Sequence, residues 1–214
     1  MYIPSMFEET RLDVMHQLMR EHSLGTFVTL GPDGLNANQL PFEIDSGDPP
    51  FGTLRAHVAR ANPVWRDASG SVESLTVFQG ARAYISPSFY ATKKEHGKVV
   101  PTYNYMVVHA YGPLRVIDDP QWVRAQLERL TGAHEAGQSE AWKLSDAPAD
   151  FIEKLLPSLV GIEIPITRLL GKWKVSQNQP RLNRIGVEDG LRTRGGSEAL
   201  AMAEAVANRG NQIA

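Results

Sequence analysis

The stretch TFVTL-GPDG-LNANQLPFEI (26–44) decides the fold class. Two runs rich in β-branched and apolar residues flank the turn sequence GPDG (31–34), whose Asp-Gly pair supplies the positive φ that a tight hairpin requires. The pattern predicts a β-hairpin whose second strand is largely buried. Three amide side chains in NANQ (36–39) interrupt that strand, and buried amides need partners. They could bind the edge of a planar heteroaromatic ligand or a neighbouring strand.

Outward from this hairpin, strands and inserted helices follow each other without regular alternation. Strands are expected at 52–59, 71–80 paired with 81–86, 103–117 and 160–175, and helices at 7–22, 62–67, twice within 118–157, and at 197–208. Pro165 indicates a sheet edge or bulge. The loop 87–102 is long, and long ordered loops are often functional. Because hairpins rather than crossover helices join the strands, a closed or split antiparallel barrel is favoured over a doubly wound parallel sheet.

Composition excludes several classes of site. The 214 residues, 42% of them hydrophobic, suffice for a domain with its own core. A net charge of -2 argues against coating of nucleic acid by bulk charge. The absence of cysteine excludes disulfides, zinc-thiolate sites and thiol nucleophiles, and six scattered histidines predict no metal site. Rossmann, P-loop, nucleophile-elbow and zinc-protease motifs are also absent.

The N-terminal residues carry no basic segment before an apolar run, and no eighteen apolar residues stand together. The sequence therefore predicts a cytoplasmic protein without a membrane partner.

Polar groups gather where a strand leads into a helix, in RAHVARANP (55–63). Free backbone N–H groups at a helix start, together with Arg60, Asn62 and His57, would suit a phosphate. The alternative is structural: Asn62 caps the following helix and His57 packs in the barrel wall.

Two further segments are rich in polar and aromatic residues. In KVVPTYNY (98–105), aromatic residues around an amide could stack on a planar ligand or form cross-strand pairs. The segment KWKVSQNQ (172–179) is typical of a solvated helix start, with Ser176 as cap and Gln179 at the third helical position.

Taken together and in order, four stretches resemble the PaiB-type FMN-binding negative transcriptional regulators. They are HVARANPVW (57–65), VFQGARAYISPSFY (77–90), KVVPTYNYMVVHAYG (98–112) and SQNQP (176–180). The resemblance implies a mainly β (α+β) fold, a split antiparallel β-barrel of the FMN-binding, pyridoxamine-phosphate-oxidase-like kind with inserted helices. It also implies a homodimer with flavin sites at its interface.

The resemblance assigns three groups of cofactor-binding residues. The FMN phosphate would lie at the strand-to-helix step, the ring edge along the second strand, and the partner's long strand would complete the pocket. These groups are His57, Ala59, Arg60 and Asn62; Asn38, Gln39 and Leu40; and Thr102 and Asn104. The domain would cover 1–180, with a helical insert at about 118–157, and 181–214 would form a C-terminal tail with a short helix.

Two functions follow. The first is a dimeric module that binds FMN or a similar planar ligand and acts as a negative transcriptional regulator, with protease and sporulation control in the family. The alternative is a flavin-dependent oxidoreductase that uses FMN for electron transfer. No residue pair stands out as a dedicated acid and base, which favours the module. DNA association, direct or indirect, would involve Arg181, Arg184, Arg192 and Arg194, interrupted by acids at 188 and 189.

Overall fold

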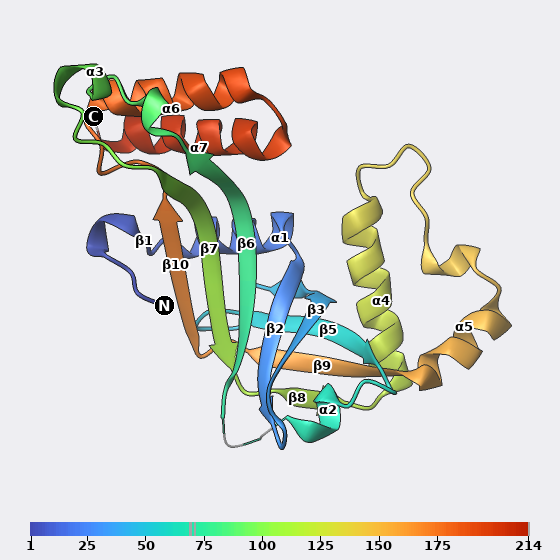
Figure 1. The fold of residues 1–214 in the computed structure, drawn as a ribbon. Coiled ribbons are helices and arrows are strands. Elements are labelled where there is room, and N and C mark those ends of the chain that lie inside the picture. Colours follow the sequence, from blue (N-terminus) through green and yellow to red (C-terminus); the bar gives the residue numbers. More distant parts are fainter. Residues whose placement is uncertain (69, 71, 214) are drawn as a thin grey trace. The chain divides into compact units, whose positions relative to one another are not determined.

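The computed structural model describes residues 1–68, 70 and 72–213, without the side chains of 210–213 (Figure 1). The chain divides into two compact units. Unit 1 comprises Met1–Met15, Gln79–Val108 and the chain from Leu170 on, and unit 2 comprises His16–Phe78 and His109–Leu169. Helix α1 (Leu12–Glu21) and strands β6 (Ser74–Ile85), β7 (Thr102–Gly112) and β10 (Arg168–Lys174) run from one unit into the other.

Unit 2 contains a four-stranded antiparallel sheet in the order β4-β5-β9-β8. Its strands are β4 (Glu43–Asp45), β5 (Thr53–Ala59), β9 (Leu159–Pro165) and β8 (Arg115–Ile117). Helix α4 (Pro120–Glu135) packs on β5 and β9, followed by α5 (Ala149–Leu155). At Gly161 a Cβ atom would lie 2.4 Å from the Trp122 ring of α4. Only glycine therefore lets the helix approach this strand so closely.

The predicted hairpin forms in unit 2 from β2 (Leu24–Gly31) and β3 (Gly34–Pro41), with Gly34 at φ 104°. β2 also pairs with the start of β6, and the rings of Phe27, Phe42 and Phe78 meet edge to face. However, β3 ends the strand order, half of its eight residues are exposed and only Leu40 is buried. The expectation that this strand is largely buried is therefore wrong, because β3 is an edge strand.

Unit 1 contains β1 (Glu8–Glu9), most of β10, and the adjoining parts of β7 and β6, in the order β1-β10-β7-β6. Two helices, α6 (Arg181–Arg194) and α7 (Ser197–Ile213), form an antiparallel hairpin around Gly195 and Gly196, both with positive φ. One core joins these helices to the sheet; its buried members include Ala83, Ile85, Val175, Leu191 and Met202.

The remaining elements of the described chain are short. They are the single turns η1 (Ser5–Phe7), η2 (Pro87–Phe89), η3 (Leu144–Asp146) and η4 (Leu156–Ser158), with α2 (Val64–Asp67) and α3 (Lys93–His96). No described helix is both long and apolar enough to cross a membrane.

Several predicted elements differ from the structure. The expected strand pair over 71–86 is one strand, β6, because Gly80 has no positive φ and makes no turn. The expected strand over 160–175 is two strands, separated after Pro165, which ends β9. Since β9 lies between β5 and β8, Pro165 marks a strand end rather than a sheet edge. Helix α6 was not predicted.

Candidate functional site

The strand-to-helix step after β5 is held together by Asn62. Its backbone N–H donates to the Ala59 carbonyl at 2.8 Å, and its Oδ1 accepts from the Val64 N–H at 3.0 Å, at the start of α2. The predicted capping role of Asn62 is therefore real. Its remaining amide group, Nδ2, donates to Oδ1 of Asn38 on β3 at 2.9 Å. The step and the amide-bearing strand consequently lie side by side within unit 2.

The amides of β3 are partnered within the chain. Asn38 Nδ2 donates to Asn36 Oδ1 at 2.9 Å, and Gln39 Nε2 donates to Thr26 Oγ1 at 3.0 Å. Gln39 is exposed, Asn38 is half-buried and Leu40 is buried. An amide has two N–H groups and a carbonyl with two lone pairs, so these residues keep capacity for a ligand on the exposed side of the strand.

Arg60 is already engaged. Its Nη1 and Nη2 bond the two carboxylate oxygens of Asp118, at 2.9 Å for Nη1. Nε and Nη2 also donate to the carbonyls of Pro157 and Leu159. The hydrogen bond from Arg60 lowers the pKa of Asp118, and the same bond raises the pKa of the guanidinium. The cation expected to face a phosphate is thus held by a carboxylate from 58 residues further along the chain.

His57 is bonded to helix α4. Its Nδ1 lies 2.8 Å from Oε1 of Gln126, a fully buried residue whose Nε2 has no hydrogen-bond partner among the described residues. This contact agrees with the structural interpretation of His57 as a residue packed in the sheet wall. Ala59, at the end of β5, is exposed.

Thr102 and Asn104 belong to unit 1, whereas the other predicted cofactor-binding residues belong to unit 2. Thr102 Oγ1 accepts a hydrogen bond from Lys174, whose Nζ also donates to the Tyr103 carbonyl at 2.9 Å. Asn104 is buried and its Nδ2 donates to Ser176 Oγ at 2.8 Å. Burial lowers the pKa of Lys174.

The expected solvated helix start at 172–179 is wrong. Lys172 and Lys174 belong to β10, where Lys172 is buried with its ammonium 5.2 Å from the Tyr105 ring centre. Ser176 has a φ of 62° and caps no helix, since α6 begins only at Arg181. The alternation of Lys172, Trp173 and Lys174 is the period-two signal that could have identified the strand.

The comparisons with known proteins decide the family. Residues 1–168 match the family model described as "Putative FMN-binding domain". The chain belongs to this family. It is 32% identical to an uncharacterised protein of Emericella nidulans, covering 98% of each chain, and 28% identical to "Protease synthase and sporulation protein PAI 2" of Bacillus subtilis, covering 95% of each. The predicted kinship with the PaiB-type proteins is thereby confirmed.

The fold comparison agrees. The flavocytochrome Anf3 from Azotobacter vinelandii superposes with a TM-score of 0.57 at 13% identity, covering 78% of this chain and 69% of the other. The predicted fold class, antiparallel sheets of the split-barrel kind with inserted helices, is confirmed. Within the described chain, no group of three or more histidine, aspartate or glutamate side chains is arranged to hold a metal ion.

Proposed function

We propose that this protein binds FMN in unit 2, with the phosphate at the strand-to-helix step and the ring edge along β3. The observation that supports the proposal is the 2.9 Å hydrogen bond between Asn62 and Asn38. It joins the two segments that the sequence assigned separately to phosphate and ring. A ligand with an anionic group and a polar planar edge could contact both at once.

In this proposal the phosphate competes with Asp118 for Arg60. A carboxylate on two guanidinium nitrogens uses the same planar, two-pronged geometry as a phosphate. The side chains of Arg60 and Asp118 are 38% and 52% exposed, so solvent weakens this ion pair and the carboxylate can leave at low cost. Ala59 and the backbone before Asn62 complete the phosphate site, and His57, bonded to Gln126, supports it from the side of α4.

The ring edge is assigned to Asn38, Gln39 and the backbone of Leu40. An isoalloxazine presents alternating carbonyl and N–H groups, and a row of amides supplies both acceptors and donors. The exposed position of β3 leaves room for such a ligand. Thr102 is proposed to complete the site of a second subunit in a homodimer, and the buried Asn104, bonded to Ser176, is proposed to hold this part of β7 in place.

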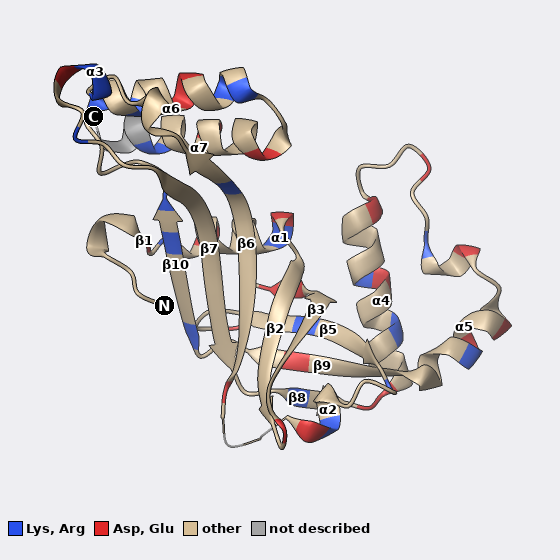
Figure 2. Ribbon diagram, viewed as in Figure 1, with Lys and Arg blue, Asp and Glu red and all other residues tan. Residues whose placement is uncertain are grey.

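We further propose that ligand binding serves negative transcriptional regulation, directly at DNA or through another protein. The relationship to the sporulation protein of Bacillus subtilis supports this role. Arg192 pairs with Glu188, and Figure 2 shows Lys and Arg interspersed with Asp and Glu along α6 and α7. Acids that interrupt the basic residues weaken a DNA-binding surface, so the proposal includes an indirect route through another protein.

The test is a calorimetric titration of the full chain with FMN and, separately, with riboflavin. FMN is expected to bind more tightly than riboflavin by about tenfold or more, because only FMN carries the phosphate. Equal affinity for FMN and riboflavin would contradict the proposed phosphate contact. Absence of binding by both ligands would contradict flavin binding. Oxidation of NADH or NADPH by the loaded protein would instead favour the oxidoreductase.

A further inference from the structure

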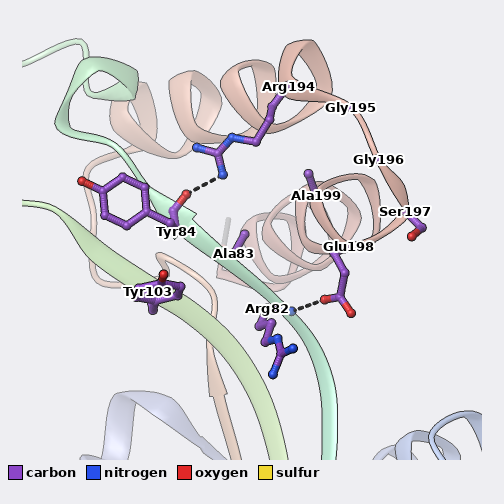
Figure 3. A pocket seen from close by; sticks show the side chains of 10 residues that line it. All are labelled: Arg82, Ala83, Tyr84, Tyr103, Arg194, Gly195, Gly196, Ser197, Glu198 and Ala199. Atoms are coloured by element: carbon purple, nitrogen blue, oxygen red, sulfur yellow. Dashed lines mark hydrogen bonds between the residues drawn. The ribbon is translucent and has the colours of Figure 1, made fainter.

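A pocket of about 500 Å³ lies in unit 1, between the edge of β6 and the turn that joins α6 to α7 (Figure 3). Its volume falls in the range of small-molecule sites. None of its residues belongs to the proposed FMN site. The lining comprises Arg82, Ala83, Tyr84, Tyr103, Arg194, Gly195, Gly196, Ser197, Glu198 and Ala199.

Part of this arrangement has a structural explanation. Glu198 accepts the backbone N–H of Arg82 at 3.0 Å, and Nη1 of Arg194 donates to the Tyr84 carbonyl at 2.7 Å. Figure 3 shows these two side chains reaching β6 from either side of the Gly195–Gly196 turn. Both bonds satisfy backbone groups on the strand's edge, which protects it from pairing with another strand. They do not explain the aromatic residues or the guanidinium of Arg82.

The aromatic part is Tyr84 and Tyr103. Their ring centres are 5.6 Å apart in an edge-to-face arrangement, and the residues are 42% and 59% exposed. Both residues line the pocket and keep exposed surface. Aromatic side chains left open in a pocket of this volume are typical of sites that stack a planar ligand.

The charged part is Arg82. It stands two residues before Tyr84 on β6, so both side chains point to the same face of the strand. Among the described residues, no hydrogen bond or ion pair engages its guanidinium. Arg194 adds a second positive charge, with its guanidinium 5.1 Å from the Phe89 ring centre, and Glu198 contributes the one carboxylate. The lining thus carries an excess of one positive charge.

Small residues complete the lining. Ala83 and Ala199 are buried in the core formed with α6 and α7, with Ala83 on the opposite face of β6 from Arg82 and Tyr84, and Gly195 and Gly196 turn the chain with φ of 70° and 86°. A Cβ atom at either glycine would meet nothing within 4 Å, so the space beside the turn is open. The first N–H groups of the 17-residue helix α7 follow directly and favour a negative group nearby.

We propose that this pocket binds a planar aromatic molecule that carries one carboxylate or phosphate. The ring lies against Tyr84 and Tyr103, and the anionic group bonds Arg82. A carboxylate and a phosphate can each bind a guanidinium through two oxygens. The proposal therefore covers both anionic groups. The proposal does not rest on FMN binding in unit 2.

The test is an NMR titration of the ¹⁵N-labelled full chain with 2-naphthoate, 2-naphthyl phosphate and the neutral 2-naphthylmethanol. Saturable shifts are expected at the amides of 82–84 and 197–199 with one or both anions, and about tenfold weaker binding of the alcohol. Binding of only one anion would say which group the site takes. Absence of shifts at these amides, or equal binding of the alcohol, would overturn the proposal.

Variants sharpen the test. Arg82→Gln should weaken anion binding about tenfold, and Tyr103→Leu, which keeps an apolar side chain but removes the ring, should weaken all three probes. Arg181→Gln is the matched control, since Arg181 is exposed at the far end of α6. Unchanged affinity in Arg82→Gln would overturn the proposal. FMN added to the same sample reports on unit 2 through the amides near Asn38 and Asn62, so the two proposals can fail independently.

Discussion

Asp118 binds Arg60 through both carboxylate oxygens, although the two residues lie 58 positions apart in the sequence. The pair ties the segment before α4 to the end of β5. It also engages the Arg60 guanidinium, which the proposal assigns to the FMN phosphate. The proposal therefore predicts a competition between an internal carboxylate and an external phosphate.

Removing the charge of Asp118 should strengthen FMN binding. In Asp118→Asn the guanidinium of Arg60 loses its anionic partner, and the phosphate no longer has to displace a carboxylate. We expect FMN affinity to rise by about three- to tenfold in calorimetry, with riboflavin affinity unchanged. A fall in FMN affinity would indicate that Asp118 positions Arg60 for the ligand rather than competing with it.

Removing Arg60 should weaken FMN binding selectively. Arg60→Gln is expected to reduce FMN affinity about tenfold or more while leaving riboflavin affinity unchanged. Arg66→Gln is the control, because both guanidinium groups lie over the Trp65 ring but Arg66 makes no contact with Asp118. Thermal unfolding should accompany the titration, since Arg60 also bonds the Pro157 and Leu159 carbonyls. Equal losses for FMN and riboflavin would exclude a phosphate contact.

The stability of the protein should fall on acidification through His109. Burial lowers the pKa of this histidine, and its Nδ1 is buried without a hydrogen-bond partner among the described residues. Above the ordinary histidine pKa of about 6.5 both the folded and unfolded states are neutral. As the pH falls below that value, the unfolded state takes up the proton first, so the free energy of unfolding decreases.

The matching variant is His109→Phe, which keeps a ring and cannot titrate. Its free energy of unfolding, measured by urea denaturation between pH 7 and pH 5, should depend less steeply on pH than that of the parent. Identical slopes in the two proteins would show that His109 makes no contribution to the acid sensitivity.

A glycine pair tests the packing of α4 on the sheet. Gly161→Ala should destabilise the protein by about 1–3 kcal/mol, because the new Cβ would lie 2.4 Å from the Trp122 ring. Gly132→Ala, within α4 itself, meets nothing within 4 Å and should stabilise by about 0.5–1 kcal/mol through helix propensity. The denaturant midpoints of both variants measure this contrast. Similar destabilisation by the two substitutions would contradict it.

Direct DNA contact through the C-terminal arginines can be tested with Arg181→Ala and Arg184→Ala together. These residues lie on α6 away from Arg194, which is committed to the Tyr84 carbonyl. If the arginines bind phosphates, the double variant should reduce the slope of log K against log salt by about 2. A mobility shift with an unchanged slope would exclude these two contacts, and no shift by the parent at low salt would exclude direct binding.

Local signals predicted the parts of the fold that depend on neighbouring residues. The hairpin was predicted from Asp33-Gly34, and Gly34 does adopt positive φ. The capping role of Asn62 likewise depends on the backbone N–H of Val64, only two residues further along the chain. The pairing of Asn62 with Asn38, and of Arg60 with Asp118, depends on which strands lie together. Such contacts have no signature in a single sequence.

Helix α6 shows why another part was missed. Gly186 and Gly190 weaken its helical pattern, since glycine is a poor helix former. In the structure a Cβ at Gly186 would lie 2.1 Å from the Phe89 carbonyl oxygen, and one at Gly190 would lie 2.3 Å from the Phe89 ring. These glycines permit a close approach of α6 to η2. Glycine is therefore needed at these positions because of tertiary packing and not because of the local helical conformation.

The most direct test of the central proposal is the visible absorption spectrum of the purified full chain after FMN is added and the excess is dialysed away. Retention of the two-band flavin spectrum, together with its loss in Arg60→Gln and its retention in Arg66→Gln, is the predicted result. A colourless parent protein after dialysis, with no heat of binding for FMN in calorimetry, would contradict FMN binding in unit 2.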